Sequence, residues 1–139
     1  MKVELCSACL LGVSCRYDGK SKSNDKILEL AKSEVLIPVC PEQLGGLPTP
    51  RVASEQKSGR VVNKEGVDVT CEFQRGAEEV LRIAKIFGVK RAILKQRSPS
   101  CGSGQIYDGT FSGKIIEGDG VTTSLLKKNG IEVISEDKI

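Results

Sequence analysis

The stretch VLIPVCPE, residues 35–42, decides the fold, because an apolar run ends there in a cysteine and stops at a proline. A short apolar run bounded by a turn signal is typical of a strand buried on both faces, and we expect a strand over residues 35–40. Upstream, VELCSAC predicts a first strand over residues 2–7. Between them, a capping residue near Asn24 and the apolar spacing that follows predict a helix to about residue 33. A strand, a crossover helix and a second strand favour a parallel pair.

The rest of the chain continues this alternation. Apolar residues at three- and four-residue steps predict a helix capped by Thr70 and ended by Gly88, and a second helix over residues 121–128. Further segments are predicted from composition: strands at 91–95 and 131–135, a small hairpin at 60–69 around Asn63–Gly66, and loops at 8–24, 41–51 and 96–113. We therefore expect an α/β fold, a single-domain three-layer sandwich over residues 1–139. Its mainly parallel sheet would have about four strands and be flavodoxin- or Rossmann-like.

Composition excludes several classes of protein. The net charge is +3, from 21 basic and 18 acidic residues spread along the chain, and aromatic residues make up 4%. This is a weak signal for nucleic acid, so we expect a small-molecule partner. No apolar run approaches the roughly 20 residues that span a bilayer, and the first residues do not resemble a secretory signal. We expect a cytoplasmic protein without a membrane partner; the sequence does not indicate its oligomeric state.

Three cysteines follow the ends of predicted strands: Cys9, Cys40 and Cys101. The carboxyl ends of parallel strands share one edge, with neighbours about 4.8 Å apart, and ligands of open α/β sheets bind at that edge. Three soft ligands without an obvious fourth indicate a metal centre with an open coordination position. Such a centre can bind a substrate, and this predicts an enzyme.

The chain has six cysteines and no histidine. Any metal must then be held mainly by sulfur, and any proton transfer must use carboxylates, hydroxyls, other polar groups or water. Cys6 lies within a predicted strand, and we expect it in the core. We also expect Cys71, in the first turn of a helix, to be buried. Cys15 lies in the first loop and can supply a fourth ligand.

Polar residues near these cysteines have two interpretations each. Glu42 follows the second cysteine across a proline, so it is either a proton-transfer group or a surface glutamate. Ser98 and Ser100 flank a proline, and their hydroxyls either donate to a developing anion or form a turn. Tyr17 and Asp18 either contact a substrate ring or belong to an Asp-Gly turn. We keep Tyr17, Asp18 and Ser100 as candidate substrate contacts.

Four motifs carry a resemblance to a known family: SACLLG at 7–12, CRYDG at 15–19, CPEQLGGLPTPR at 40–51 and KQRSPSCG at 95–102. Together, and in this order, they resemble the family long catalogued as domain of unknown function 523. The characterised members of that family are similar to thiouracil desulfidase. The resemblance extends from about residue 3 to the C-terminal strand.

The resemblance implies a 4Fe–4S cluster whose fourth iron is open, held by Cys9, Cys40 and Cys101. Cys15 would lie beside the cluster or act as an alternative ligand. The resemblance further implies that Glu42 and Ser98 are the acid/base residues. The implied reaction is the non-redox conversion of thiouracil to uracil and hydrogen sulfide. The open iron takes the sulfur and water supplies the oxygen.

Two other hypotheses remain. The first is a non-catalytic zinc- or sulfur-binding module with a closed four-cysteine site, formed by Cys9, Cys15, Cys40 and Cys101. The second is a thiol redox protein that uses the C-x-x-C pair Cys6 and Cys9. The cluster enzyme is the leading hypothesis.

Overall fold

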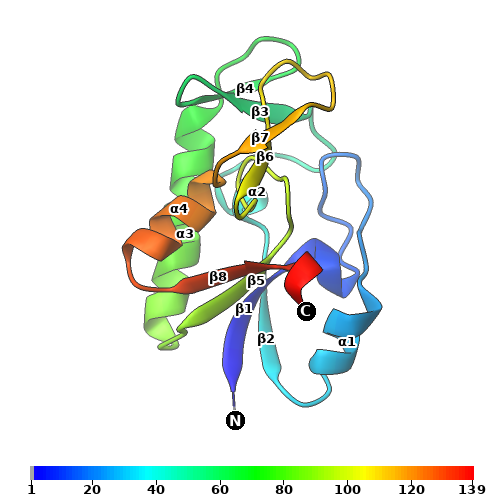
Figure 1. Cartoon of the computed structure of the whole chain (residues 1–139), viewed down its shortest axis with the longest axis vertical. Helices are drawn as coiled ribbons and strands as arrows, with labels where there is room; N and C mark the ends of the chain where they lie inside the picture. The colour runs from blue at the N-terminus through cyan, green and yellow to red at the C-terminus, as the bar shows by residue number, and fades with distance from the viewer. Residues whose placement is uncertain (1) are drawn as a thin grey trace.

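The computed structural model describes residues 2–139. At its centre is a four-stranded parallel sheet with the order β2-β1-β5-β8 (Figure 1). The strands are β1 (Val3–Ser7), β2 (Val35–Val39), β5 (Arg91–Leu94) and β8 (Glu132–Ser135). All four lie where the apolar runs predict strands, which confirms the α/β fold.

Helices cover both faces of this sheet. Helices α3 (Thr70–Ile86) and α4 (Val121–Lys128) pack against each other beside one face, and α1 (Asp25–Leu30) lies beside the other (Figure 1). Successive strand residues point to opposite faces. Accordingly, Leu5 joins the core under α3 and α4, whereas Cys6 packs in the cluster that includes Ile27 of α1. The three-layer arrangement follows from strands that are apolar on both faces.

The helix boundaries have local causes. Asn24 caps α1, because its side-chain oxygen accepts hydrogen bonds from the backbone N–H groups of Lys26 and Ile27. Helix α4 spans the predicted residues. The prediction that Thr70 caps α3 is wrong: Val69 is at the capping position, and the Thr70 hydroxyl instead accepts the backbone N–H of Val61.

Short elements replace three of the predicted loops. A helix α2 (Pro41–Leu44) forms directly after Cys40, because a proline fits the first turn of a helix. Two antiparallel hairpins form as well, β3 (Ser54–Lys57) with β4 (Arg60–Asn63), and β6 (Gln105–Tyr107) with β7 (Ile115–Glu117). The loop prediction was therefore wrong for 41–44 and 105–107. A 3₁₀ helix η1 (Ala8–Leu11) likewise follows β1 inside the loop predicted for 8–24.

The hairpin predicted for residues 60–69 is present in part. Asn63 and Val67 are joined by a backbone hydrogen bond across the turn, and Val69 donates to Val61. Strand β4 also pairs with β3, which the sequence did not predict.

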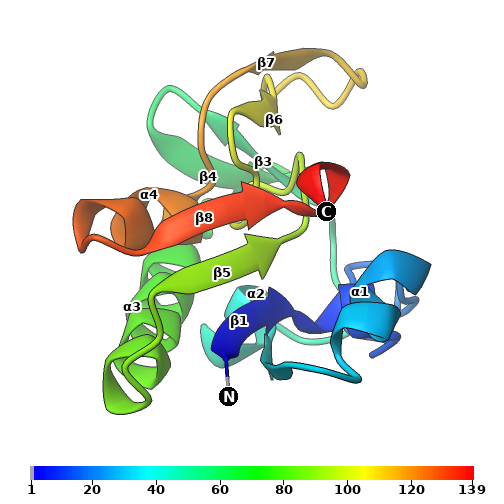
Figure 2. The ribbon, with the colours of Figure 1, turned by 60° about the horizontal axis from the view of Figure 1, so that its bottom comes forward.

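The order in which strands are added to the sheet reverses at β1. Its two neighbours are β2, reached through α1, and β5, reached only after α2, the β3–β4 hairpin and α3. The chain leaves β1 toward β2 on one side and returns to β5 on the other side. The carboxyl ends of β1 and β5 therefore mark a topological switch point, the place where open α/β sheets bind ligands. Both hairpins lie beyond the carboxyl ends of the strands (Figures 1 and 2). Within residues 2–139 no helix combines the length and apolar character needed to cross a bilayer.

Candidate functional site

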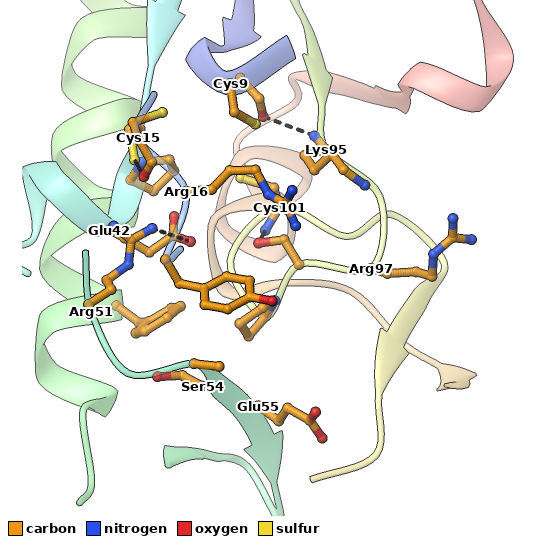
Figure 3. A pocket seen from close by; sticks show the side chains of 18 of the residues that line it. Cys9, Cys15, Arg16, Glu42, Arg51, Ser54, Glu55, Lys95, Arg97 and Cys101 are labelled. Atoms are coloured by element: carbon orange, nitrogen blue, oxygen red, sulfur yellow. Dashed lines mark hydrogen bonds and ion pairs between the residues drawn. The ribbon is translucent and has the colours of Figure 1, made fainter. Parts of the chain in front are cut away.

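A cavity of about 630 Å³ opens beyond the carboxyl ends of the strands (Figure 3). Its wall is built by the loops after β1, β2 and β5, by α2, and by both hairpins. Its size falls within the range of about 300–1,000 Å³ typical of ligand pockets. The switch point of the sheet is therefore also the site of a large cavity.

Four cysteines from separate segments line this cavity: Cys9, Cys15, Cys40 and Cys101. Cys9 lies in η1, and Cys40 is the capping residue of α2. All four thiols are free; Cys40 is half-buried and the other three are buried. The structure thus places the three strand-end cysteines and Cys15 on the wall of one cavity, and Figure 3 labels Cys9, Cys15 and Cys101 there.

The thiols influence one another. Contact with Cys40 lowers the pKa of Cys15, but contact with Cys9 and burial outweigh it and raise this pKa to about 11. The hydrogen bond with Cys15, together with burial, raises the pKa of the Cys40 thiol far above its usual value. Burial and the charge of Glu42 likewise raise the pKa of the Cys101 thiol far above its usual value. Without a cation, these three groups are therefore neutral thiols at pH 7.

This donor set fits a soft cationic group. A thiol ligates metal as the thiolate, and a metal ion in the cavity would favour that form. Across residues 2–139, no three Cys, Asp or Glu side chains are gathered closely enough to hold one metal ion. Proteins hold iron–sulfur clusters with cysteine thiolates, and the four thiols on this cavity wall are donors of that kind.

Glu42 lies in α2 with its carboxylate toward Arg51 (Figure 3). The carboxylate and guanidinium are 3.6 Å apart, and the side chains are only 15% and 8% exposed. Burial raises the pKa of Glu42, while the charge of Arg51 opposes this. Arg51 is itself fixed, because its guanidinium donates to Thr49 Oγ1 and to the Pro48 carbonyl. Glu42 is thus a mostly buried side chain and not a solvent-exposed surface glutamate.

Ser98 also lines the cavity. Its Oγ accepts the backbone N–H groups of Ser100 and Cys101, each at 3.1 Å, so it shapes the turn that carries Cys101. None of the side-chain hydrogen bonds found in residues 2–139 uses the Ser98 hydroxyl as a donor, which leaves its proton for a group in the cavity.

Of the three candidate substrate contacts, only Tyr17 lines the cavity. Tyr17 lines the cavity and is 44% exposed, with the Arg16 guanidinium 5.6 Å from its ring centre. Asp18 and Ser100 are not among the lining residues. The Asp18 carboxylate accepts the backbone N–H of Lys20, as in a turn. Ser100 is fully buried and is hydrogen-bonded to Thr122.

Sequence reasoning missed the positive charge of the cavity wall, which comes from Arg16, Arg51, Lys64, Lys95 and Arg97. These residues lie outside the periodic helices and strands, so no apolar pattern marks them. The quoted motifs did contain four of the five, all except Lys64.

The loop after β5 is held by the C-terminal 3₁₀ helix η2 (Glu136–Lys138). One Glu136 oxygen accepts the backbone N–H of Gln96 at 2.6 Å, and the other lies 3.0 Å from Lys95 Nζ. The Gln96 side chain in turn makes two hydrogen bonds to the backbone of Ser103. The loop that carries Ser98 and Cys101 is therefore anchored at its base.

The two other cysteines lie outside the cavity wall. Cys6 is fully buried, as expected, and burial raises the pKa of its thiol to about 12. The prediction that Cys71 is buried is wrong, since it is exposed. The buried face of α3 runs through Phe73, Ala77 and Val80, and Cys71 lies off that face.

Together, fold and site define a class: an α/β protein with a thiol-lined ligand cavity at the switch point of a parallel sheet. The chain belongs to the 2-thiouracil desulfurase family, whose model matches residues 5–138. This confirms the resemblance seen in the motifs.

Individual relatives agree with this assignment. The chain is 44% identical to the uncharacterised protein YbbK of Bacillus subtilis (strain 168), over 97% of this chain and 96% of that protein. It is also similar to a solved structure, the [4Fe-4S]-dependent thiouracil desulfidase TudS. That match has a TM-score of 0.95 and 46% identity, and covers 100% of this chain and 93% of that one.

Proposed function

We propose that this protein removes the sulfur of a thiolated uracil, using a 4Fe–4S cluster held by Cys9, Cys40 and Cys101. One observation carries the proposal: thiols from separate segments converge with a buried carboxylate on one cavity. The family and the [4Fe-4S]-dependent neighbour support it further. Free thiols suit a reducing compartment, and we place the protein in the cytoplasm.

The reaction is a hydrolysis that balances without electron transfer. Thiouracil and water give uracil and hydrogen sulfide: the C=S bond becomes C=O, and the sulfur leaves with the two protons of water. When bound, the cluster supplies an iron whose open position is a Lewis acid with affinity for sulfur. The protein must then move protons and hold a planar ring.

Glu42 and Ser98 are the proposed proton-transfer groups. Burial raises the pKa of Glu42 above its usual value, and the charge of the nearby Arg51 opposes this rise. Ser98 lines the same cavity, and within residues 2–139 its hydroxyl only accepts hydrogen bonds. Tyr17 is the proposed contact for the substrate ring. In our assignment, Cys15 borders the ligands as a neighbour or an alternative ligand, because it touches two of them.

The decisive experiment is anaerobic purification and cluster reconstitution, followed by iron, sulfide and zinc analysis and a hydrosulfide-release assay with 2- and 4-thiouracil. We expect a brown protein that releases hydrosulfide. Cys101→Ala should lose both cluster and turnover, because it removes a buried ligand. The exposed Cys71→Ala is the matched control and should keep both.

Two results would overturn the proposal. A colourless protein that binds zinc and takes up no iron would support the zinc module. A brown protein that releases no hydrosulfide from either thiouracil would retain the cluster and reject the reaction.

A further inference from the structure

The aromatic residues of this chain are unevenly placed. Of its five aromatic side chains, four line the cavity, namely Tyr17, Phe73, Tyr107 and Phe111. The fifth, Phe87, is exposed at the end of α3. In a chain so poor in aromatic residues, this concentration indicates a cavity suited to a flat ring.

Phe111 reaches the cavity from the loop that joins β6 and β7. Its backbone has φ of 56°, a left-handed conformation that is strained for a bulky residue. Such a conformation persists only where the surroundings enforce it, and it is found at functional sites. The structure must therefore contain a contact that holds this loop.

Glu55 of β3 provides that contact. Its Oε1 accepts the backbone N–H of Gly109 at 3.0 Å and that of Phe111 at 3.1 Å, from more than fifty residues away. Glu55 is 9% exposed, and no ion pair within residues 2–139 includes it. The charge of the Glu55 carboxylate is thus stabilised by the backbone N–H groups of the loop.

The fit between loop and strand is close. Gly109 has φ of 94°, and a Cβ there would lie 2.7 Å from the Gln56 carbonyl oxygen. Glu55 itself lies on the opposite side of the cavity from Cys9, away from the cysteines (Figure 3). It therefore acts on the cavity wall and not on the cluster ligands.

We propose that Glu55 is a positioning residue that clamps the β6–β7 loop, so that Phe111 forms the wall against which a flat substrate ring packs. The substrate class rests on the proposed function, whereas the clamp does not. Loss of the clamp should weaken substrate binding and leave the chemical step largely intact, because Glu55 is remote from the cysteines.

The test compares four variants of the holoprotein. Glu55→Ala removes the acceptor, Glu55→Gln keeps an oxygen in its place, and Phe111→Leu removes the flat ring without touching the clamp. Glu117→Ala, an exposed glutamate of the same hairpin, is the control. Hydrogen exchange over residues 105–117 reports the clamp, and exchange in α3 reports global stability. Steady-state kinetics with 2-thiouracil report binding.

In Glu55→Ala we expect exchange in the loop to be faster by about tenfold or more, as for the loss of charge-assisted hydrogen bonds, with α3 unchanged. The KM should rise at least about fivefold with kcat within about twofold, the signature of lost uniform binding. Glu55→Gln should restore most of the loop's protection from exchange and most of the wild-type KM. Phe111→Leu should raise KM without faster exchange.

Loop exchange in Glu55→Ala equal to that of the wild type would reject the clamp. Faster exchange with an unchanged KM in both Glu55→Ala and Phe111→Leu would reject the role in substrate binding. A wild-type protein that protects the loop but does not turn over thiouracil would count against the proposed function and not against the clamp.

Discussion

At the scale of single residues, three features of Glu42 bear on its chemistry. It is buried beside thiols, it faces one guanidinium, and it belongs to the first turn of a short helix. The turn fixes its backbone next to Cys40, and Arg51 fixes its carboxylate. A carboxylate held in this way is suited to the proton transfer that we propose for Glu42.

Replacing Glu42 by Gln tests that role. The amide keeps the size and a hydrogen-bonding oxygen but cannot act as a general acid or base at neutral pH. We expect turnover of thiouracil to fall about 10²- to 10⁴-fold, the usual contribution of general acid–base catalysis, while iron content stays at the wild-type level. Iron lost in parallel with activity would instead make Glu42 a structural residue.

Replacing Cys15 by Ala tests whether this cysteine is a ligand of the proposed cluster or only a neighbour of the ligands. Cys15 is buried and touches Cys9 and Cys40, but our assignment gives the cluster to three other cysteines. We therefore expect Cys15→Ala to keep the iron and sulfide content of the wild type, measured after anaerobic reconstitution. A loss as complete as that in Cys101→Ala would make Cys15 a ligand.

At the scale of elements, two glycines allow α2 to rest on α3. A Cβ at Gly76 of α3 would overlap the carbonyl oxygen of Pro41, and a Cβ at Gly45 would overlap that of Glu72. Backbone therefore packs directly on backbone at this contact. The position of Cys40 and Glu42 depends on it, because both belong to the start of α2.

Gly76→Ala should separate these helices. Overpacking of a tight contact costs about 1–3 kcal/mol, and we expect the free energy of unfolding in urea to fall by that amount. Cluster content and turnover should fall as well, because α2 is displaced. The exposed neighbour Gln74→Ala is the control, and its unfolding free energy should change by less than about 0.5 kcal/mol. Equal stabilities would show that α2 adapts without cost.

At the scale of the whole molecule, the sheet could be predicted from the sequence and much of the cavity wall could not. Residues 35–39 and 91–94 are locally apolar, so they indicate strands without any knowledge of their partners. The burial expected from these runs is confirmed for β5 but wrong for β2, which lies at the edge of the sheet with only Val39 buried. The hairpins are held by distant contacts instead. For example, the Gln56 amide donates to the carbonyl oxygens of Pro99 and Asp119. No local pattern records such a contact.

The same distinction applies to the candidate site. Cys9, Cys40 and Cys101 could be predicted to meet, because each follows a strand of one parallel sheet. Arg51 and Glu55 could not, because they approach the cavity from a loop and a hairpin whose placement depends on tertiary packing.

The acid stability of the whole molecule should depend on Asp68. Its carboxylate accepts the backbone N–H of Thr70 and pairs with Arg60. The hydrogen bonds with Thr70, followed by that with Arg60, lower its pKa from 3.8 to about 2. A lowered pKa means that the folded state favours the charged form. This stabilisation is present above pH 3.8 and is lost as the pH falls toward 2.

Asp68→Asn should therefore be less stable than the wild type at pH 7, and the difference should shrink as the pH falls from about 4 to about 2. Urea unfolding midpoints across this range would measure it. Glu65→Gln, a nearby exposed change without a side-chain hydrogen bond, should show no such trend. A difference that is constant with pH would exclude Asp68 as the titrating group.

The contact between Glu136 and the loop after β5 has a practical consequence for handling this protein. Glu136 lies close to the last residue, Ile139, yet its carboxylate anchors the base of the loop that carries Cys101. The N-terminal end of β1 lies at the amino ends of the strands, away from the carboxyl ends that border the cavity (Figures 1 and 2). Attachment to a surface through the C-terminal segment would therefore place the load next to the Glu136 anchor of the cavity loop, whereas attachment near Val3 would keep it away from that anchor.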